Sequence, residues 1–95
     1  MAWTNEQLSA VWSKGMTAGT TDPNEWRKDE CGAWIAWAHY GDHSSQFGWE
    51  VDRIKSVEGG GGEELSNLRP LHWRNIAAKQ DGSLVCGLSA SGQLG

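Results

Sequence analysis

The sequence is poor in the residues from which several common kinds of site are built. It has only two cysteines, Cys31 and Cys86, which are too few for a four-cysteine zinc site. The two can form one disulfide or remain as two free thiols. No apolar run is long enough to span a bilayer, and no charged segment followed by an apolar segment comes after Met1. We therefore expect a cytoplasmic protein with no membrane partner. Because the cytoplasm is reducing, we also expect the two thiols to be reduced.

Positive charge is also scarce. Twelve acidic residues stand against eight lysines and arginines, for a net charge of −4. Proteins that bind nucleic acid by neutralising phosphates usually show the opposite balance, so the charge disfavours tight DNA binding. The glycine run from Gly59 to Gly62 is not followed by Gly-Lys-Ser or Gly-Lys-Thr, which excludes a phosphate-binding P-loop.

Aromatic residues other than tryptophan are nearly absent. The chain has one Tyr, one Phe and seven Trp. Its 95 residues are enough for one domain with a modest core but too few for two. We therefore expect a single domain over residues 1 to 95 whose core is built largely from indole rings, each of which needs a partner for its N–H when buried.

The N-terminal part, residues 4 to 30, is predicted to be helical. Thr4 and Gln7 have the spacing of a capping box. Three apolar residues then fall on one helical face, namely Leu8, Val11 and Trp12. This pattern predicts a helix over residues 5 to 14. Asp22 before Pro23 predicts a second, short helix that runs to Lys28, and the mixed charges of residues 27 to 30 indicate a solvated face.

The middle and the end of the chain contain two candidate strands and one further helix. The apolar stretch from Cys31 to His39 favours a buried strand over a helix by a small margin. Residues 47 to 54 alternate, so a strand there places Asp52 and Arg53 on opposite faces. A short extended piece is expected at residues 69 to 71 because of its proline, followed by a helix of about two turns from His72. Residues 87 to 95 are small and polar and are expected to be flexible.

The stretch from residue 48 to 79, GWEVDRIKSVEGGGGEELSNLRPLHWRNIAAK, resembles the HNH nucleases. Residues 10 to 15, 26 to 32 and 40 to 41 are similar to the same positions of short bacterial HNH proteins that lack zinc-binding cysteine pairs. The resemblance implies an α+β fold with a ββα-metal core in residues 48 to 80. In that core an antiparallel hairpin clasps a helix, and the N-terminal helices pack beside it.

The resemblance also assigns roles to single residues, and two of the expected groups are missing. Asp52 matches the aspartate that binds a divalent metal such as Mg²⁺, and Asn67 matches the asparagine that fixes the histidine-bearing loop. Arg53 stands where the family has the histidine that activates water, and a guanidinium cannot act as that base because it keeps its protons at any working pH. The last metal ligand is expected at position 76, where Ile76 has no donor atom. The nearest substitute is Asn75, which points elsewhere on a helix.

Two functions remain open on these residues. The first is a catalytically degenerate HNH-like module that binds or inhibits a protein of nucleic-acid processing, or binds DNA weakly. The alternative is an active metal-dependent HNH endonuclease in which His72 replaces the lost base or ligand. For either one, four cations are candidates for binding nucleic acid or a partner: Arg53, Arg69, Arg74 and Lys79.

Overall fold

A computed structural model describes residues 3 to 93. Within that range the chain forms two α-helices, α1 and α2, and two antiparallel two-stranded sheets, β1–β2 and β3–β4. Three short 3₁₀ helices lie at Trp37–His39, Leu65–Asn67 and Ala90–Gly92. The predicted α+β class is confirmed. No helix in the described part of the chain is long and apolar enough to cross a membrane.

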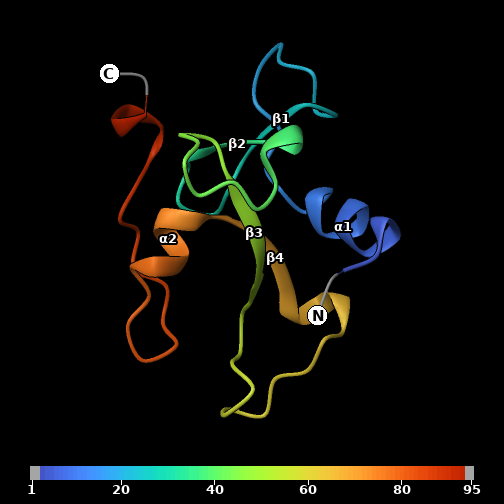
Figure 1. Cartoon of the computed structure of the whole chain (residues 1–95), viewed down its shortest axis with the longest axis vertical. Helices are drawn as coiled ribbons and strands as arrows, with labels where there is room; N and C mark the ends of the chain where they lie inside the picture. The colour runs from blue at the N-terminus through green and yellow to red at the C-terminus, as the bar shows by residue number, and fades with distance from the viewer. Residues whose placement is uncertain (1–2, 94–95) are drawn as a thin grey trace.

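The centre of the molecule is the hairpin of β3 (Trp49–Arg53) and β4 (Leu68–His72). The two strands are antiparallel, with Trp49 opposite His72 and Arg53 opposite Leu68. The chain then passes directly into α2 (Trp73–Ala77), where the His72 side chain accepts a hydrogen bond from the backbone of Arg74. Helix α2 lies on one side of the hairpin and α1 on the other (Figure 1). The two strands pair where predicted, and a helix follows them, although it begins one residue later than predicted and is shorter than the predicted two turns.

Helix α1 (Asn5–Trp12) begins at the predicted capping box. The Thr4 hydroxyl accepts from the Gln7 backbone at 3.1 Å, and the Gln7 side chain accepts from the Thr4 backbone at 2.8 Å. The helix ends two residues earlier than predicted. Its buried face is the predicted one: Leu8, Val11 and Trp12.

The predicted second helix is wrong, because residues 26 to 28 form a strand. Asp22 does start one turn, as its carbonyl accepts from the Trp26 backbone at 2.8 Å. The chain then enters β1 (Trp26–Lys28), which pairs with β2 (Trp34–Ala36), while Lys28 also bridges to Met16. One turn of helix is too short to persist alone, and the sheet gives these backbone groups partners on both sides.

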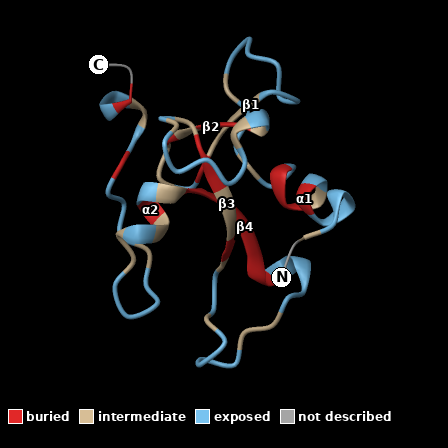
Figure 2. Ribbon diagram, viewed as in Figure 1, coloured by how far each residue is buried: buried red, intermediate tan, exposed pale blue. Residues whose placement is uncertain are grey.

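The core contains a cluster of indole rings, as predicted. Trp12 and Trp49 are buried with their ring centroids 5.1 Å apart, and Trp37 packs against both. Such aromatic pairs contribute about 0.5–1.5 kcal/mol beyond the area they bury. The indole N–H of Trp12 donates to the Pro23 carbonyl at 2.9 Å, but that of the fully buried Trp49 has no partner within the described residues, so the expectation of a partner for every buried N–H is wrong there. Figure 2 shows that burial is concentrated on the hairpin and the inner side of α1, while the long hairpin loop is exposed.

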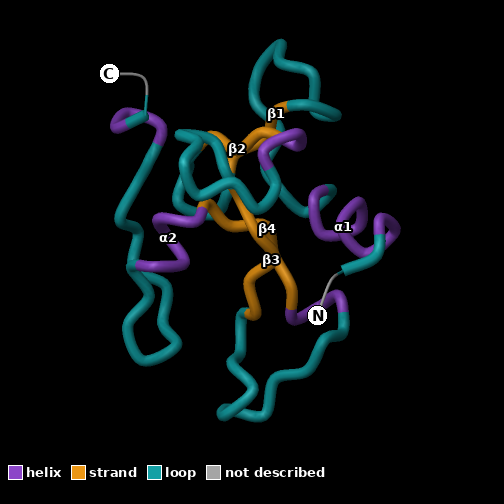
Figure 3. Tube along the Cα trace, viewed as in Figure 1, coloured by secondary structure: helices purple, strands orange, loops and turns teal. Residues whose placement is uncertain are grey.

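Two predictions about the C-terminal region are corrected by the structure. Cys31 and Cys86 form a disulfide, so the expectation of reduced thiols is wrong. Residues 87 to 93 are docked on the domain, with Leu88 and Gln93 buried, so they do not form a flexible tail. Residues 94 and 95 of the predicted tail lie outside the described residues. Figure 3 shows residues 87 to 93 as a loop that contains a short helical turn, beside the rest of the fold.

Candidate functional site

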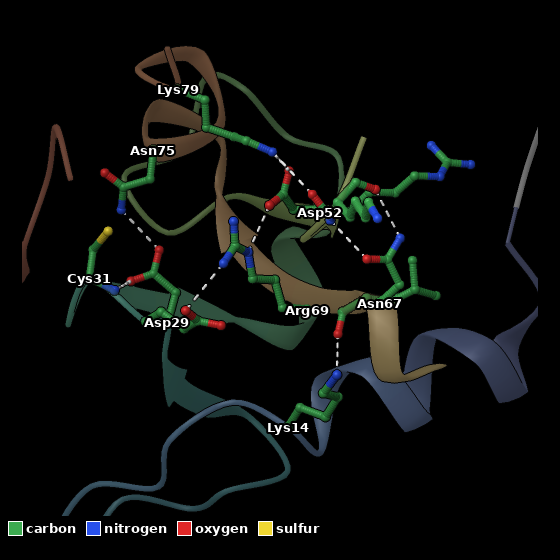
Figure 4. Close-up of polar contacts among 12 residues, drawn as sticks. Lys14, Asp29, Cys31, Asp52, Asn67, Arg69, Asn75 and Lys79 are labelled. Carbon is green, nitrogen blue, oxygen red and sulfur yellow. Dashed lines mark hydrogen bonds and ion pairs between the residues drawn. The ribbon is translucent and has the colours of Figure 1, made fainter. Parts of the chain in front are cut away.

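Asp52 is the centre of the candidate site. Its side chain is 6% exposed, and both carboxylate oxygens are bound by cations of the same chain. Arg69 Nε donates to Oδ2 at 2.8 Å and Lys79 Nζ donates to Oδ1 at 2.9 Å. Arg69 is the residue opposite Asp52 in the β3–β4 ladder, and Lys79 follows α2, so hairpin and helix meet at this carboxylate (Figure 4). A buried carboxylate needs such partners, because burial without them costs several kcal/mol.

The two cations extend the contact in both directions. Lys79 Nζ also donates to the Arg53 carbonyl at 3.1 Å. Arg69 Nη1 donates to Glu30 at 3.2 Å, where the Glu30 side chain is about half exposed. The result is a row of alternating charges that joins Lys79, two residues beyond α2, to β3, β4 and Glu30, the second residue after β1. We call Lys79, Asp52, Arg69 and Glu30 the ion-pair row.

The residues at the expected metal positions do not fit a divalent ion. Both oxygens of Asp52 are engaged, and the side chain of Ile76 has no donor atom. Asn75 is fully buried, with its amide oxygen accepting from the Leu88 backbone at 2.8 Å. Within residues 3 to 93, no group of three or more His, Cys, Asp or Glu side chains is placed to hold a metal.

Asp29 is a buried residue whose importance the sequence did not reveal, because it lies in a run predicted to be solvated. It is 1% exposed. One carboxylate oxygen accepts from the backbones of Cys31 and Ala33, at 3.0 and 2.9 Å. The other accepts from the His72 backbone at 3.0 Å and the Asn75 side chain at 2.9 Å. The signal in the sequence was turn chemistry: an aspartate three residues before Gly32 is typical of a turn in which the side chain binds the backbone that follows.

His72 is not placed as a base for this site. It is 0% exposed, and burial lowers the pKa of its imidazole. Nδ1 accepts from the Arg74 backbone at 3.0 Å, and Nε2 donates to the Gln46 carbonyl at 2.7 Å. In β4, His72 is three residues from Arg69, so the two side chains lie on opposite faces of the strand. The structure therefore does not bring His72 together with Asp52.

Asn67 holds the long hairpin loop closed. Its amide oxygen accepts from the Lys55 backbone at 2.8 Å, and its amide nitrogen donates to the carbonyls of Lys55 and Gly62 at 3.0 and 2.8 Å. A Cβ at Gly61 would lie 1.8 Å from the Lys55 carbonyl oxygen, so this part of the glycine run needs a residue without a side chain. Asn67 thus braces the loop with contacts to its backbone.

The four predicted binding cations do not form a free basic surface. Arg69 and Lys79 are held by Asp52. Arg53 pairs with Glu63 at 2.6 Å. Arg74 is exposed and lies over the Trp73 ring at 5.3 Å, and of the four it alone has no ion pair within the described residues. A row of phosphates would therefore meet few available cations here.

No protein-family model, curated protein or solved structure matches this chain.

Proposed function

We propose that this chain is an HNH-like ββα module that has lost catalysis and acts by binding a protein of nucleic-acid processing. The observation that carries the proposal is the position of Arg69 and Lys79 on Asp52, at 2.8 and 2.9 Å. Asp52 is the residue that the resemblance assigns to the metal. The order of hairpin and helix, with Lys79 just beyond α2 binding Asp52 in β3, supports the same assignment of elements. In this proposal two side-chain cations do the neutralising that a metal ion does in an active nuclease.

Electrostatics make the internal cations and a metal mutually exclusive. At a separation of about 4 Å and an effective dielectric constant of about 20, each pair of unit charges interacts by about 4 kcal/mol. Because a divalent ion carries two charges, its repulsion from each nearby cation, Arg69 and Lys79, would be about twice this value. It would bind only if Lys79 left its place, which would also give up the hydrogen bond to the Arg53 carbonyl.

The chemistry of water activation is also missing. A guanidinium group is not a base for water, so Arg53 does not replace the histidine of the family, and both ring nitrogens of His72 are engaged. A well-placed general base typically contributes about 10²–10⁴ to the rate. Without a base and a metal, the chain keeps only the shape and charge of its surface, which can serve for binding. A net charge of −4 favours a partner with a basic surface, which proteins that handle nucleic acid present.

The proposal is tested by comparing the native chain with a variant in which the site is rebuilt. The triple variant Arg53→His, Ile76→Asn, Lys79→Ala restores the base and ligand and removes the internal cation. Each protein is titrated with Mg²⁺, Mn²⁺, Ni²⁺ or Zn²⁺ to millimolar concentration while Tm and plasmid nicking are measured. We expect no metal-dependent change in the native chain and a metal-dependent rise in Tm in the variant.

A matched control isolates the role of Lys79. The variant Arg53→His, Ile76→Asn, Lys55→Ala removes an exposed lysine instead and should gain less metal affinity than the triple variant above. Metal-dependent nicking by the native chain that disappears in Asp52→Asn would show that the proposal is wrong. If the rebuilt chain folds and still binds no metal, the assignment of Asp52 to the metal position is wrong.

A further inference from the structure

The C-terminal segment of residues 87 to 93, which we call the strap, covers the outer edge of β2. The Ala90 backbone donates to the Gly32 carbonyl at 3.1 Å. The Gln93 side-chain amide binds Trp34 as a neighbouring strand would: its oxygen accepts from the Trp34 backbone N–H, and its nitrogen donates to the Trp34 carbonyl at 2.8 Å. Strand β1 pairs along the other edge. The strap therefore occupies backbone groups that would otherwise form an open sheet edge.

Apolar burial holds the strap only weakly. Leu88 is its one buried apolar residue within the described range, and the remaining residues are small or polar. Asn75 binds the Leu88 backbone through both its amide atoms, at 2.8 and 3.1 Å. Ordering a segment of this length costs conformational entropy that so little apolar burial offsets poorly. This is why the sequence by itself predicts a flexible tail.

The disulfide gives the strap a covalent attachment to the domain. Cys86 immediately precedes the strap, and Cys31 lies in the connection between β1 and β2, next to Gly32. The bond therefore anchors the strap at the edge that it covers. Cys86 is exposed and Cys31 half-buried, so the bond lies at the surface, where an external thiol can reach it.

We propose that Cys31–Cys86 is a redox-controlled latch that keeps the strap on the edge of β2. A dithiol reductant opens it by exchange. One reductant thiolate attacks a cysteine sulfur, the Cys31–Cys86 bond breaks, and a mixed disulfide forms. The second reductant thiolate then displaces the remaining cysteine. Two electrons and two protons pass to the protein, which gains two thiols, and the reductant leaves as its own disulfide.

Opening the latch changes a defined surface. The Gly32 carbonyl and the N–H and carbonyl of Trp34 lose their partners on the strap. The cavity of about 210 Å³ that Leu88, Gly92 and Gln93 help to line opens on the same side. The hairpin β3–β4 makes its own ladder and is not part of the covered edge, so it stays folded. This inference does not depend on the proposed function, and either can fail without the other.

Hydrogen exchange of the full chain, oxidised and after treatment with dithiothreitol, tests the latch. Three backbone N–H groups donate hydrogen bonds between the strap and the rest of the domain: those of Leu88, Ala90 and Trp34. In the reduced protein we expect each to exchange at least about tenfold faster. The Ile54 amide, which donates to the Asn67 carbonyl at 2.8 Å, should keep its protection, and reoxidation should restore the first three.

Two variants keep the test decisive. Cys31→Ser with Cys86→Ser should show the reduced pattern without any reductant. Oxidised Gln93→Ala should lose protection at Trp34 while Leu88 stays protected, since the disulfide still anchors the strap. Unchanged strap protection after both thiols have been shown to react with an alkylating agent would overturn the proposal. Loss of protection at Ile54 to the same degree would overturn it too, because the bond would then hold the whole fold and not the strap.

Discussion

Replacement of Lys79 by methionine removes the ammonium from Asp52 and keeps most of the volume of the side chain. Lys79 is 16% exposed in its side chain and donates to Asp52 at 2.9 Å and to the Arg53 carbonyl at 3.1 Å. Breaking a buried ion pair costs roughly 3–5 kcal/mol, and a hydrogen bond to a charged group contributes roughly 1.5–3 kcal/mol. Because Asp52 keeps Arg69, we expect a loss of about 2–3 kcal/mol in the free energy of unfolding.

Urea unfolding followed by tryptophan fluorescence measures this loss. For a domain of this size it corresponds to a fall in Tm of roughly 10–20 °C. Lys55→Met is the matched control, because Lys55 is exposed and its ammonium makes no ion pair within residues 3 to 93; it should change stability by less than about 0.5 kcal/mol. In an Asp52→Asn background, Lys79→Met should cost less than in the native chain by roughly 1 kcal/mol or more, because the charge partner is already gone and the hydrogen bond to the Arg53 carbonyl is what remains to be lost.

Two results would refute the reasoning. If Lys79→Met is as stable as the native chain, the ammonium does not neutralise Asp52 in solution. If Lys79→Met costs the same with Asp52 and with Asn at position 52, the loss comes from packing and not from the ion pair. Either result would remove the main support for a site filled by internal cations.

Three further predictions concern other parts of the molecule. Burial lowers the pKa of His72 in the folded state, so its contribution to stability is complete above the unfolded pKa of about 6.5 and is lost as the pH falls through the lower folded pKa. His72→Gln should remove this part of the pH dependence of stability, measured by urea unfolding at several pH values. An unchanged dependence on pH would contradict the prediction. Asn67→Ala removes three hydrogen bonds to the loop backbone and should lower the free energy of unfolding by about 2–3 kcal/mol. It should also speed proteolysis within residues 55 to 62, which mass spectrometry of the fragments would show. DNA should bind no more tightly than roughly 10⁻⁴ to 10⁻⁶ M at physiological salt, and an electrophoretic shift at nanomolar protein would contradict that prediction.

The sequence predicts elements whose signals are local. The capping box of α1 and the alternation of β3 involve residues a few positions apart, and both elements were found where predicted. Strand β1 was missed because Trp26, Arg27 and Lys28 show no alternation, while the aspartate and proline before them favour a helix. Only partners distant in the chain, at Met16 and in β2, make this segment a strand.

The candidate site was harder to predict than the fold, because it depends on which charges meet. Lys79 lies 27 residues from Asp52 in the sequence, and nothing local indicates that it folds back onto that carboxylate. From the sequence, Lys79 was a candidate cation for binding nucleic acid. The disulfide was missed for a similar reason: a segment with so little apolar content gives no sign that it returns to Cys31.

Asp29 has a consequence for the order in which the chain folds. One of its oxygens serves backbone groups two and four residues away, at Cys31 and Ala33. The other serves His72 and Asn75, at separations of 43 and 46 residues. The near contacts close a small loop and can form early, whereas the distant ones must await the assembly of β4 and α2. We therefore expect the two halves of one carboxylate to act at different stages: Asp29→Ala should both slow folding and accelerate unfolding, because it removes two bonds that can form early and two that form late.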